Sequence, residues 1–404
     1  MYIARQPIFN SQKRVYGYEL LFRGQRDAQG FDGTSATEAS ASVIAGLFES
    51  GIEKIVENKK AFVNVDHNLI GMDFVELIPA NRLVLEILED VVINEKLQKR
   101  IRYLSEQGYQ IALDDFIHDY SNYPLVKEAD IIKYDLMATP LHTIKGGVEK
   151  GLKEKKVLLA EKVEWEEDFR KAKAMGFTLF QGFFFSKPAI IGGKNQTKTT
   201  SKAQYFRLIQ ELQGEEPSFH RLAKMIGQDV NLAYRFIRVI SGRTGENSVD
   251  SIKKALTFMG LRELERWIHV LMIQELGKDK PRELVNLSLV RSKFAERLAK
   301  SLGFKKHRHE AALVGLFSTI DALTDQNMQQ ALDGIALTKA VRSALLEEEQ
   351  GELGVVVQII QLYEKGQWSN IDRLAGKLGL QSEEIADCYL KSVEWAKKTM
   401  ADMA

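Results

Sequence analysis

The stretch Ile111-Ala112-Leu113-Asp114-Asp115 carries the pattern that decides the fold of the first half of this chain. Three apolar residues are followed at once by a pair of carboxylates. An apolar run this short, bounded by polar residues, is typical of a buried β-strand. The sequence therefore predicts a strand that ends in this pair, with both carboxylates at its carboxyl end.

The same pattern, a short apolar run that ends in a polar group, recurs elsewhere between residues 62 and 181. The further runs are Phe62-Val63-Asn64, Leu83-Val84-Leu85-Glu86, Ile131-Ile132-Lys133, Leu158-Leu159-Ala160-Glu161 and Leu179-Phe180-Gln181. Their polar markers and Asp114 are separated by 22, 28, 19, 28 and 20 residues in chain order. A strand, a helix and two loops need about this length. Repeated units of this kind predict a TIM-like α/β barrel whose polar strand ends meet at one rim.

The polar markers also indicate what the rim could bind. Five of the six are acids or amides, and the sixth is Lys133. Acidic side chains that meet at one rim repel one another unless a cation lies among them, and hard divalent cations prefer oxygen ligands. The pattern therefore predicts a metal site at the rim.

The barrel is expected to start with an antiparallel pair of strands. The candidates are Met1–Asn10 and Val15–Phe22, and the four residues between them look like a hairpin loop. Between the later strands we expect one helix over Glu95–Gln107, capped by Asn94, and another over Glu164–Met175.

Bulk properties limit the class of protein. The 404 residues suggest two domains, and the formal net charge of +1 gives no basic field, so nucleic acid is not an expected partner. The single cysteine, Cys388, allows no intramolecular disulfide and indicates a reducing compartment. No apolar run approaches the roughly 18 residues of a membrane span, and the N-terminus lacks the order of a signal peptide. We therefore expect a cytoplasmic protein without a membrane segment.

The second half of the chain has a different periodicity. Residues 191–202 are small and polar, and after them apolar residues recur about every 3.6 positions, which predicts an all-α domain. The expected helices are Ala203–Gln213, Phe219–Ile226, Leu232–Ile240, Val249–Phe258, Glu263–Glu275, Arg282–Ser301, His309–Leu323, Val355–Tyr363 and Glu384–Met400. We therefore expect a barrel domain over residues 1–190, a linker over 191–202 and a helical domain over 203–404.

The polar strand ends, taken in order, resemble the motifs of EAL domains. The namesake motif reads Glu19-Leu20-Leu21, followed by Phe22-Arg23. The other matching segments are Asn64, Leu85-Glu86-Ile87-Leu88-Glu89, Asp114-Asp115-Phe116, Ile132-Lys133-Tyr134-Asp135, Ala160-Glu161-Lys162-Val163-Glu164 and Gln181-Gly182-Phe183. So many positions in the family's order make the resemblance specific over about residues 1–190.

This resemblance implies a bacterial signalling protein that hydrolyses cyclic di-GMP to linear pGpG. Two divalent ions about 4 Å apart can activate the attacking water and stabilise the developing charge, so Mg²⁺ or Mn²⁺, in a site that could hold two ions, is the expected cofactor. By resemblance, the metal ligands are Glu19, Asn64, Glu86, Asp114, Asp115 and Glu161. The resemblance assigns catalysis to Lys133, Glu161 and Gln181, substrate binding to Arg23 and loop anchoring to Glu89.

The helical half resembles an HDOD domain, a relative of HD phosphohydrolases, through Ser248–Trp267 and Ala311–Ser318. The whole chain resembles the YuxH-like class, which joins a short EAL domain to an HDOD domain. An HD-type hydrolase needs a His-Asp pair in this half, and the only such dipeptide, His118-Asp119, lies in the barrel half. We therefore expect the HDOD domain to dock another protein rather than to catalyse a reaction.

The loop after Asp115 departs from the EAL pattern. It reads Ile117-His118-Asp119 where the family has Gly-Thr-Gly, and Lys162 stands where glycine is usual. Glycine adopts backbone angles that isoleucine avoids, so the loop is expected to follow another path. Two functions therefore stay open: a competent phosphodiesterase, or a degenerate EAL domain that acts as a nucleotide receptor or a scaffold with HDOD as the output module.

Two observations are expected to separate these functions. A metal ion among the rim acids would favour the enzyme. Direct contact of Lys133 or Lys162 with those acids, filling the metal site, would favour the degenerate domain. A homodimer is left open.

Overall fold

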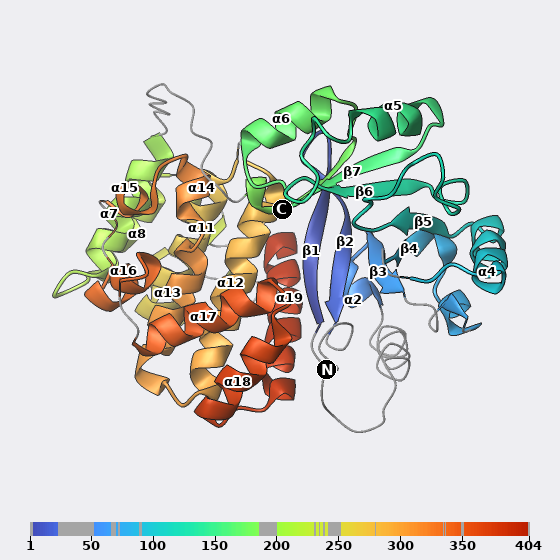
Figure 1. Ribbon diagram of the computed structural model, residues 1–404. Helices are drawn as coiled ribbons and strands as arrows, with labels where there is room; N and C mark the ends of the chain where they lie inside the picture. The colour runs from blue at the N-terminus through green and yellow to red at the C-terminus, as the bar shows by residue number, and fades with distance from the viewer. Residues whose placement is uncertain are drawn as a thin grey trace.

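The computed structural model describes residues 3–22, 52–65, 70–71, 73–88, 91–185, 200–229, 252–278, 280–333, 337–348 and 351–402, with residue 335 and a few residues between 232 and 240. A β/α barrel and a helical half lie side by side, and β1 and β2 form the barrel wall nearest the helices (Figure 1). The barrel comes from the first half of the chain and the helices from the second.

Eight strands close the barrel in the order of the sequence. They are β1 (Ile3–Asn10), β2 (Val15–Phe22), β3 (Lys60–Val65), β4 (Leu83–Ile87), β5 (Gln110–Leu113), β6 (Ile131–Asp135), β7 (Val157–Glu161) and β8 (Leu179–Gln181). β1 pairs antiparallel with β2 and β8, and all other neighbouring strands pair parallel. The predicted TIM-like barrel with an antiparallel start is confirmed.

Apolar side chains from seven of the strands fill the interior of the barrel. They are Ile8, Phe62, Val84, Ala112, Ile131, Leu159 and Leu179. On β2, Gly17 packs against Phe62, and a Cβ atom there would lie 2.7 Å from the Phe62 ring and 2.8 Å from the Lys60 carbonyl oxygen. Because such contacts are too short for a real Cβ, glycine is what allows Phe62 to fill the interior.

Helices and short 3₁₀ turns connect the strands around the outside. They are α2 (Ile52–Val56), η1 (Asp73–Leu77), η2 (Ala80–Arg82), α4 (Glu95–Glu106), α5 (Lys145–Lys153), α6 (Glu166–Ala174) and η3 (Phe183–Phe185). Asn94 caps α4 as predicted, since its side chain accepts a hydrogen bond of 2.9 Å from the backbone nitrogen of Leu97. Leu97, Ile101 and Leu104 form the buried face of this helix.

The helical half contains α7 (Thr200–Leu212), α8 (Phe219–Gly227), α10 (Ile252–Met259), α11 (Leu261–Leu276), α12 (Arg282–Ser301), η4 (Lys305–His307), α13 (Arg308–Phe317), α14 (Ile320–Thr324), α15 (Met328–Ala331), α16 (Lys339–Leu345), α17 (Glu352–Glu364), α18 (Trp368–Leu378) and α19 (Ser382–Asp402). The sequence did not predict α15, α16 or α18. The helix expected over Leu232–Ile240 falls partly outside the described residues. None of the described helices is both long enough and apolar enough to cross a bilayer.

The prediction of a single helix over His309–Leu323 is wrong, because the helix is interrupted between α13 and α14. The hydroxyl of Ser318 bonds back to the Gly315 carbonyl at 2.8 Å, and the hydroxyl of Thr319 bonds to Ser288 on α12. Serine and threonine side chains that bond in this way compete with the backbone ladder of a helix. Thr319 accordingly has a non-helical backbone, with φ −122° and ψ 13°.

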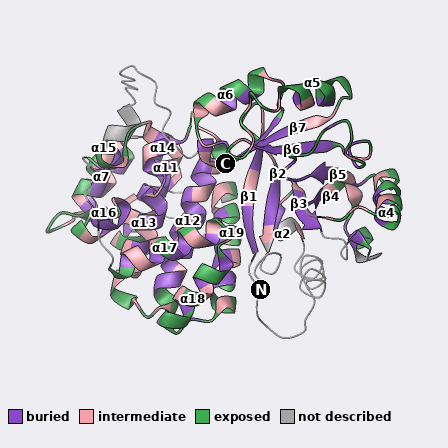
Figure 2. Ribbon diagram, viewed as in Figure 1, coloured by how far each residue is buried: buried purple, intermediate pink, exposed green. Residues whose placement is uncertain are grey.

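Direct hydrogen bonds connect the two halves. The Tyr363 hydroxyl of α17 donates to the Ile3 carbonyl of β1 at 3.0 Å. The Tyr18 hydroxyl of β2 lies 3.1 Å from a Glu283 carboxylate oxygen of α12, and Arg5 lies over the Tyr18 ring at 4.4 Å. Buried residues line both sides of this contact (Figure 2).

Candidate metal centre and active site

A layer of polar side chains lies above the apolar interior, because residues two apart on a strand point to the same face. Asn64 follows Phe62 by two positions, and Glu86 follows Val84 in the same way. The layer consists of Gln6, Glu19, Asn64, Glu86, Asp114, Lys133, Glu161 and Gln181, one from each strand or its end. All except Gln6 are at least nine-tenths buried. The barrel therefore brings every predicted strand-end group to one rim.

Lys133 lies at the centre of the acids. Its Nζ is 2.6 Å from Glu86 Oε1, 2.7 Å from Asp114 Oδ1 and 3.0 Å from Glu161 Oε1. Its side chain is fully buried. The lysine contact considered in the sequence analysis is therefore present, with Glu86, Asp114 and Glu161.

The burial and the charges of this cluster shift its pKa values strongly. Burial raises the pKa of the Glu86 and Glu161 carboxyls well above their usual range, and the charge of Lys133 offsets this only in part. Burial by itself lowers the pKa of Lys133, but the four surrounding carboxylates outweigh it and raise that pKa well above its ordinary value. Lys133 is therefore a permanent cation held within the acids.

Three carboxylates converge beside this lysine. Asp114, Asp115 and Glu161 each offer an oxygen, and these oxygens lie within 4.8 Å of one another. Glu161 Oε2 is buried and has no hydrogen-bond partner among the described residues. Carboxylate oxygens in this arrangement are ligands that hard divalent cations prefer, and Lys133 contacts the other oxygen of Glu161. The residues present therefore fit a divalent cation next to Lys133.

Glu19 is held on another side of the layer by two amides. Asn64 Nδ2 donates to Glu19 Oε1 at 3.1 Å, and Gln181 Nε2 donates to Glu19 Oε2. Gln181 Nε2 also donates to Gln6 Oε1 at 3.0 Å. Gln181 Oε1 is buried and has no hydrogen-bond partner among the described residues, so it is available as an acceptor.

The backbone turns sharply after three of the polar strand ends. Asp115, Lys162 and Gly182 follow Asp114, Glu161 and Gln181, with φ values of 40°, 51° and 139°. A Cβ atom on Gly182 would collide with the backbone of Val163, so this position requires glycine. The turn after β7 instead tolerates a lysine in the left-handed region.

Lys162 pairs with Asp135 at the end of β6. Burial tends to raise the pKa of Asp135, but the bond from Lys162 and the backbone N–H groups of Met137 and Ala138 hold that pKa below its usual value. Lys162, which stands where glycine is usual in the family, therefore pairs with Asp135, an acid that is not one of the three converging carboxylates.

The loop after Asp115 is held by aromatic contacts. The His118 ring stacks on Tyr123 at 4.4 Å with an interplanar angle of 9°, and the buried Phe116 packs edge-on against Tyr123. Asp119 accepts a 3.0 Å bond from the backbone nitrogen of Ser121. The three residues that replace the expected glycine pattern have no positive φ, so this path needs no glycine.

The sequence analysis did not predict Gln6, one member of the polar layer, and it named two site residues that the structure does not describe. Arg23 and Glu89 lie outside the described residues. Gln6 was missed because β1 runs antiparallel, so its polar residue precedes the interior residue Ile8 instead of following it. The predicted hairpin contained the signal, since its register places Gln6 opposite Glu19.

A closed barrel with acids around a buried lysine, joined to a helical half, defines a two-domain class of protein. Residues 1–188 match the EAL domain family, and residues 200–357 match the HDOD domain family.

Two curated relatives match nearly the whole chain. The cyclic di-GMP phosphodiesterase CdgJ of Vibrio cholerae is 31% identical over 405 residues, covering 98% of this chain and 92% of CdgJ. The uncharacterized protein YuxH of Bacillus subtilis is 33% identical over 422 residues, covering 99% of each chain. The chain belongs to this family of EAL–HDOD proteins.

Solved structures with EAL domains are similar over part of the chain. BlrP1 of Klebsiella pneumoniae, solved with manganese and cyclic di-GMP, is 22% identical, with a TM-score of 0.39 over 46% of this chain and 55% of that one. YkuI of Bacillus subtilis, solved with cyclic di-GMP and calcium, is 23% identical, with a TM-score of 0.39 over 63% of this chain and 72% of that one. Similarities at this level carry no argument about the site.

Proposed function

We propose that this protein hydrolyses cyclic di-GMP to linear pGpG with a divalent cation, Mg²⁺ or Mn²⁺, bound at the barrel rim. The observation that carries the proposal is the convergence of Asp114, Asp115 and Glu161 within 4.8 Å beside Lys133. The nearly full-length similarity to CdgJ, a cyclic di-GMP phosphodiesterase, supports the choice of substrate. We further assign Glu19, Asn64 and Glu86 as additional ligands, which the sequence resemblance implies.

The residues of the rim have distinct roles in this proposal. A bound divalent cation lowers the pKa of its water and neutralises the charge that develops on a phosphodiester. Lys133, whose ammonium group contacts Glu86, Asp114 and Glu161, stabilises through its positive charge the negative charge that develops on the phosphorane. Oε1 of Gln181 and Oε2 of Glu161 have no hydrogen-bond partner within the described part of the chain. Gln181 Oε1 accepts a hydrogen bond from the attacking water, and Glu161 Oε2 is available to a metal ion or a proton. We assign Arg23 to the substrate and Glu89 to loop anchoring on the resemblance alone.

A second candidate function is a nucleotide receptor or scaffold, with the helical domain as its output. The observation that favours it is the contact of Lys133 with three acids, because this lysine already supplies a positive charge to the cluster. If the positive charge of Lys133 weakens the binding of a divalent cation, the protein would bind cyclic di-GMP without hydrolysing it.

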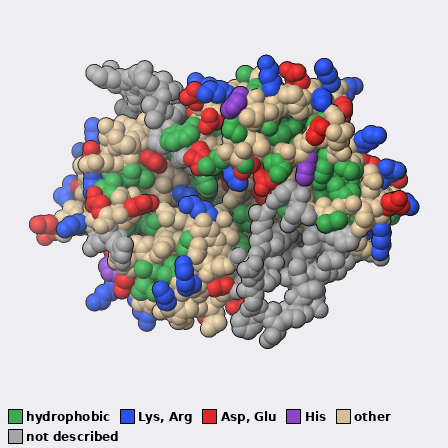
Figure 3. Space-filling view, viewed as in Figure 1, with side chains coloured by type: hydrophobic (Ala, Val, Ile, Leu, Met, Phe, Trp, Pro, Cys, Tyr) green, Lys and Arg blue, Asp and Glu red, His purple; other side chains and the backbone are tan. Residues whose placement is uncertain are grey.

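We infer the assembly and setting from the sequence and the matches together. We propose a barrel domain over residues 1–190, a linker over 191–202 and a helical domain over 203–404. The EAL match covers residues 1–188, and the HDOD match covers 200–357, which leaves the last 47 residues of the proposed helical domain outside it. The helical domain is proposed to dock a protein partner in the cytoplasm, and a homodimer is one arrangement to test. Charges of both signs are interspersed over the face in Figure 3, which gives no support for nucleic acid as a partner.

The test is turnover of cyclic di-GMP by the full chain in Mg²⁺ and in Mn²⁺, followed as pGpG by chromatography. Glu161→Gln should lower the rate by about 100-fold or more, because it removes a catalytic carboxylate. Glu149→Gln, which changes an exposed acid on α5, is the matched control and should leave the rate unchanged. Binding of cyclic di-GMP without turnover would establish the receptor, and absence of both would establish the scaffold.

A further inference from the structure

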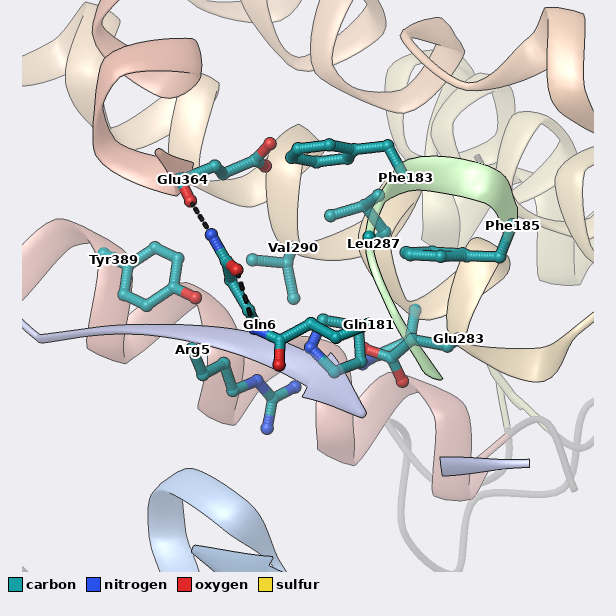
Figure 4. Close-up of a pocket in the computed structure, with 13 residues that line it drawn as sticks. Arg5, Gln6, Gln181, Phe183, Phe185, Glu283, Leu287, Val290, Glu364 and Tyr389 are labelled. Atoms are coloured by element: carbon teal, nitrogen blue, oxygen red, sulfur yellow. Dashed lines mark hydrogen bonds between the residues drawn. The ribbon is translucent and has the colours of Figure 1, made fainter. Parts of the chain in front are cut away.

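Gln6 connects the helical domain to the metal layer of the barrel. Its Nε2 donates to the carbonyl of Glu364, at the end of α17, at 3.1 Å. Its Oε1 accepts from Gln181 Nε2 at 3.0 Å, and the same Gln181 nitrogen donates to Glu19. Figure 4 shows the two bonds of Gln6 in line between the helix and the strands. One amide therefore lies between the helical domain and the glutamate of the namesake motif.

The amide of Gln6 supplies both the donor and the acceptor that this arrangement needs. A residue at this position has to donate to a carbonyl and accept from an N–H group, and a primary amide does both. A carboxylate can only accept, and a hydrocarbon can do neither. The register of β1 opposite β2 places Gln6 beside Glu19, and the Gln6 side chain reaches both the Glu364 carbonyl and Gln181.

The helical end of the connection is held firmly. Arg291 of α12 binds both carboxylate oxygens of Glu364, with Nε at 2.7 Å and Nη2 at 2.5 Å. Both side chains are largely buried, where a bidentate pair fixes geometry well. The Glu364 carbonyl is therefore positioned by α12 as well as by α17.

A small cleft lies beside Gln6. Its cavity volume is about 50 Å³, and it lies between β1, β8, α12 and α17. Gln6, Gln181 and Glu364 all line it (Figure 4). A shift of α17 relative to β1 would change the hydrogen bond between Gln6 and the Glu364 carbonyl, and with it the bond between Gln6 and Gln181.

We propose that Gln6 is a positioning residue through which the helical domain sets the orientation of Gln181 and Glu19, and with it the metal affinity and turnover of the barrel. A partner that moves α17 would act on the rim through this residue. The part that concerns turnover rests on the proposed phosphodiesterase function, and the part that concerns metal affinity rests on the proposed role of Glu19 as a metal ligand but not on catalysis.

The test is a double-mutant cycle that measures Mn²⁺ affinity by calorimetry without nucleotide. Arg291→Met releases Glu364 and should change the dissociation constant for Mn²⁺ by about fivefold when Gln6 is present. In the Gln6→Met background, the same change at Arg291 should have no effect. Glu364→Gln is a milder second variant that keeps the side-chain shape. Arg342→Met, which breaks the Arg342–Asp333 pair, is the matched control and should change nothing.

Kinetics and folding measurements complete the test. With cyclic di-GMP, Gln6→Met should lower kcat more than it changes KM, because Gln181 and Glu19 lose their orientation while the substrate contacts remain. Thermal unfolding of each variant excludes general loss of structure. Independent effects of Arg291 and Gln6 on Mn²⁺ affinity, an Arg291 effect equal to that of Arg342, or no Mn²⁺ binding by the wild type would each overturn the inference. Coupled Mn²⁺ affinities without turnover would overturn the proposed enzyme and leave this inference standing.

Discussion

Lys133 is the residue on which the balance of charge in the rim depends. Replacing it with methionine would leave Glu86, Asp114 and Glu161 buried without their cation. Because breaking a buried ion pair leaves an uncompensated charge, the free energy of unfolding should fall by about 3–5 kcal/mol in the absence of metal. Mn²⁺ should restore part of this loss, since the cation takes over the missing charge. Urea denaturation with and without Mn²⁺ measures both effects.

Lys162→Met is the matched control for this prediction. Lys162 also pairs with a carboxylate, that of Asp135, but its own side chain is 55% exposed. Its loss should cost at most about 1 kcal/mol, because exposed ion pairs contribute little. A Lys133→Met protein that is no less stable than Lys162→Met, or that Mn²⁺ does not stabilise, would contradict this account of the rim.

His269 of α11 makes stability depend on pH. It is fully buried against Phe317, and burial lowers its pKa from 6.5 to about 4. Between pH 6.5 and pH 4, His269 is protonated in the unfolded chain but neutral in the folded chain. The free energy of unfolding therefore decreases as the pH falls through this range. From this group alone, the free energy of unfolding should be about 2 kcal/mol lower at pH 5 than at pH 7.

The measurement is urea denaturation of the wild type and His269→Leu at both pH values. The leucine variant should show the smaller pH dependence, by the amount assigned to His269. His220→Leu, at an exposed position on α8, serves as the control and should keep the wild-type dependence. Equal pH dependence of the wild type and His269→Leu would show that this histidine does not carry the effect.

At the scale of elements, Gly17 determines how β2 fits against β3. An alanine there would place its Cβ within 2.8 Å of the Phe62 ring and the Lys60 carbonyl. Gly17→Ala should therefore lower the free energy of unfolding by about 1–3 kcal/mol through overpacking. Gly146→Ala, on α5 with no atom within 4 Å of the added Cβ, should stabilise the protein by about 0.4–1 kcal/mol. Thermal unfolding of the two variants should give shifts of opposite sign, and a shared sign would contradict the packing argument.

The elements also show how far the sequence predicts this structure. Alternation along each strand placed the polar ends on one rim, because the step from Phe62 to Asn64 is repeated on β4 to β8. The same reasoning did not find Gln6, since an antiparallel strand reverses the order of apolar and polar residues. It did not find the break at Thr319 either, because the hydroxyl of Thr319 bonds to Ser288, which is 31 residues away. Contacts between distant segments are what a local pattern cannot contain.

At the scale of the whole molecule, the two domains meet at a buried contact that includes Tyr363. Tyr363 is fully buried, and its ring packs against Phe294, Trp368 and Tyr389 in the helical domain. Its hydroxyl reaches across to the Ile3 carbonyl of the barrel. Aromatic packing fixes the position of this hydroxyl, so the domains are joined by a directional bond as well as by apolar area.

Removing the hydrogen bond between Tyr363 and Ile3 should therefore destabilise both domains. Tyr363→Phe keeps the packed ring but leaves the buried Ile3 carbonyl without this donor, which should cost about 1–3 kcal/mol. Hydrogen–deuterium exchange should become faster in peptides that contain β1 and in peptides that contain α17, because each loses support from the other. Tyr103→Phe on α4 removes a hydroxyl that bonds only to Glu76 of η1 among the described residues, far from the domain contact, and should leave both sets of peptides unchanged. Faster exchange confined to α17 would mean that the helical domain packs against the barrel without stabilising it, and the rim would then keep its geometry when the helical domain moves.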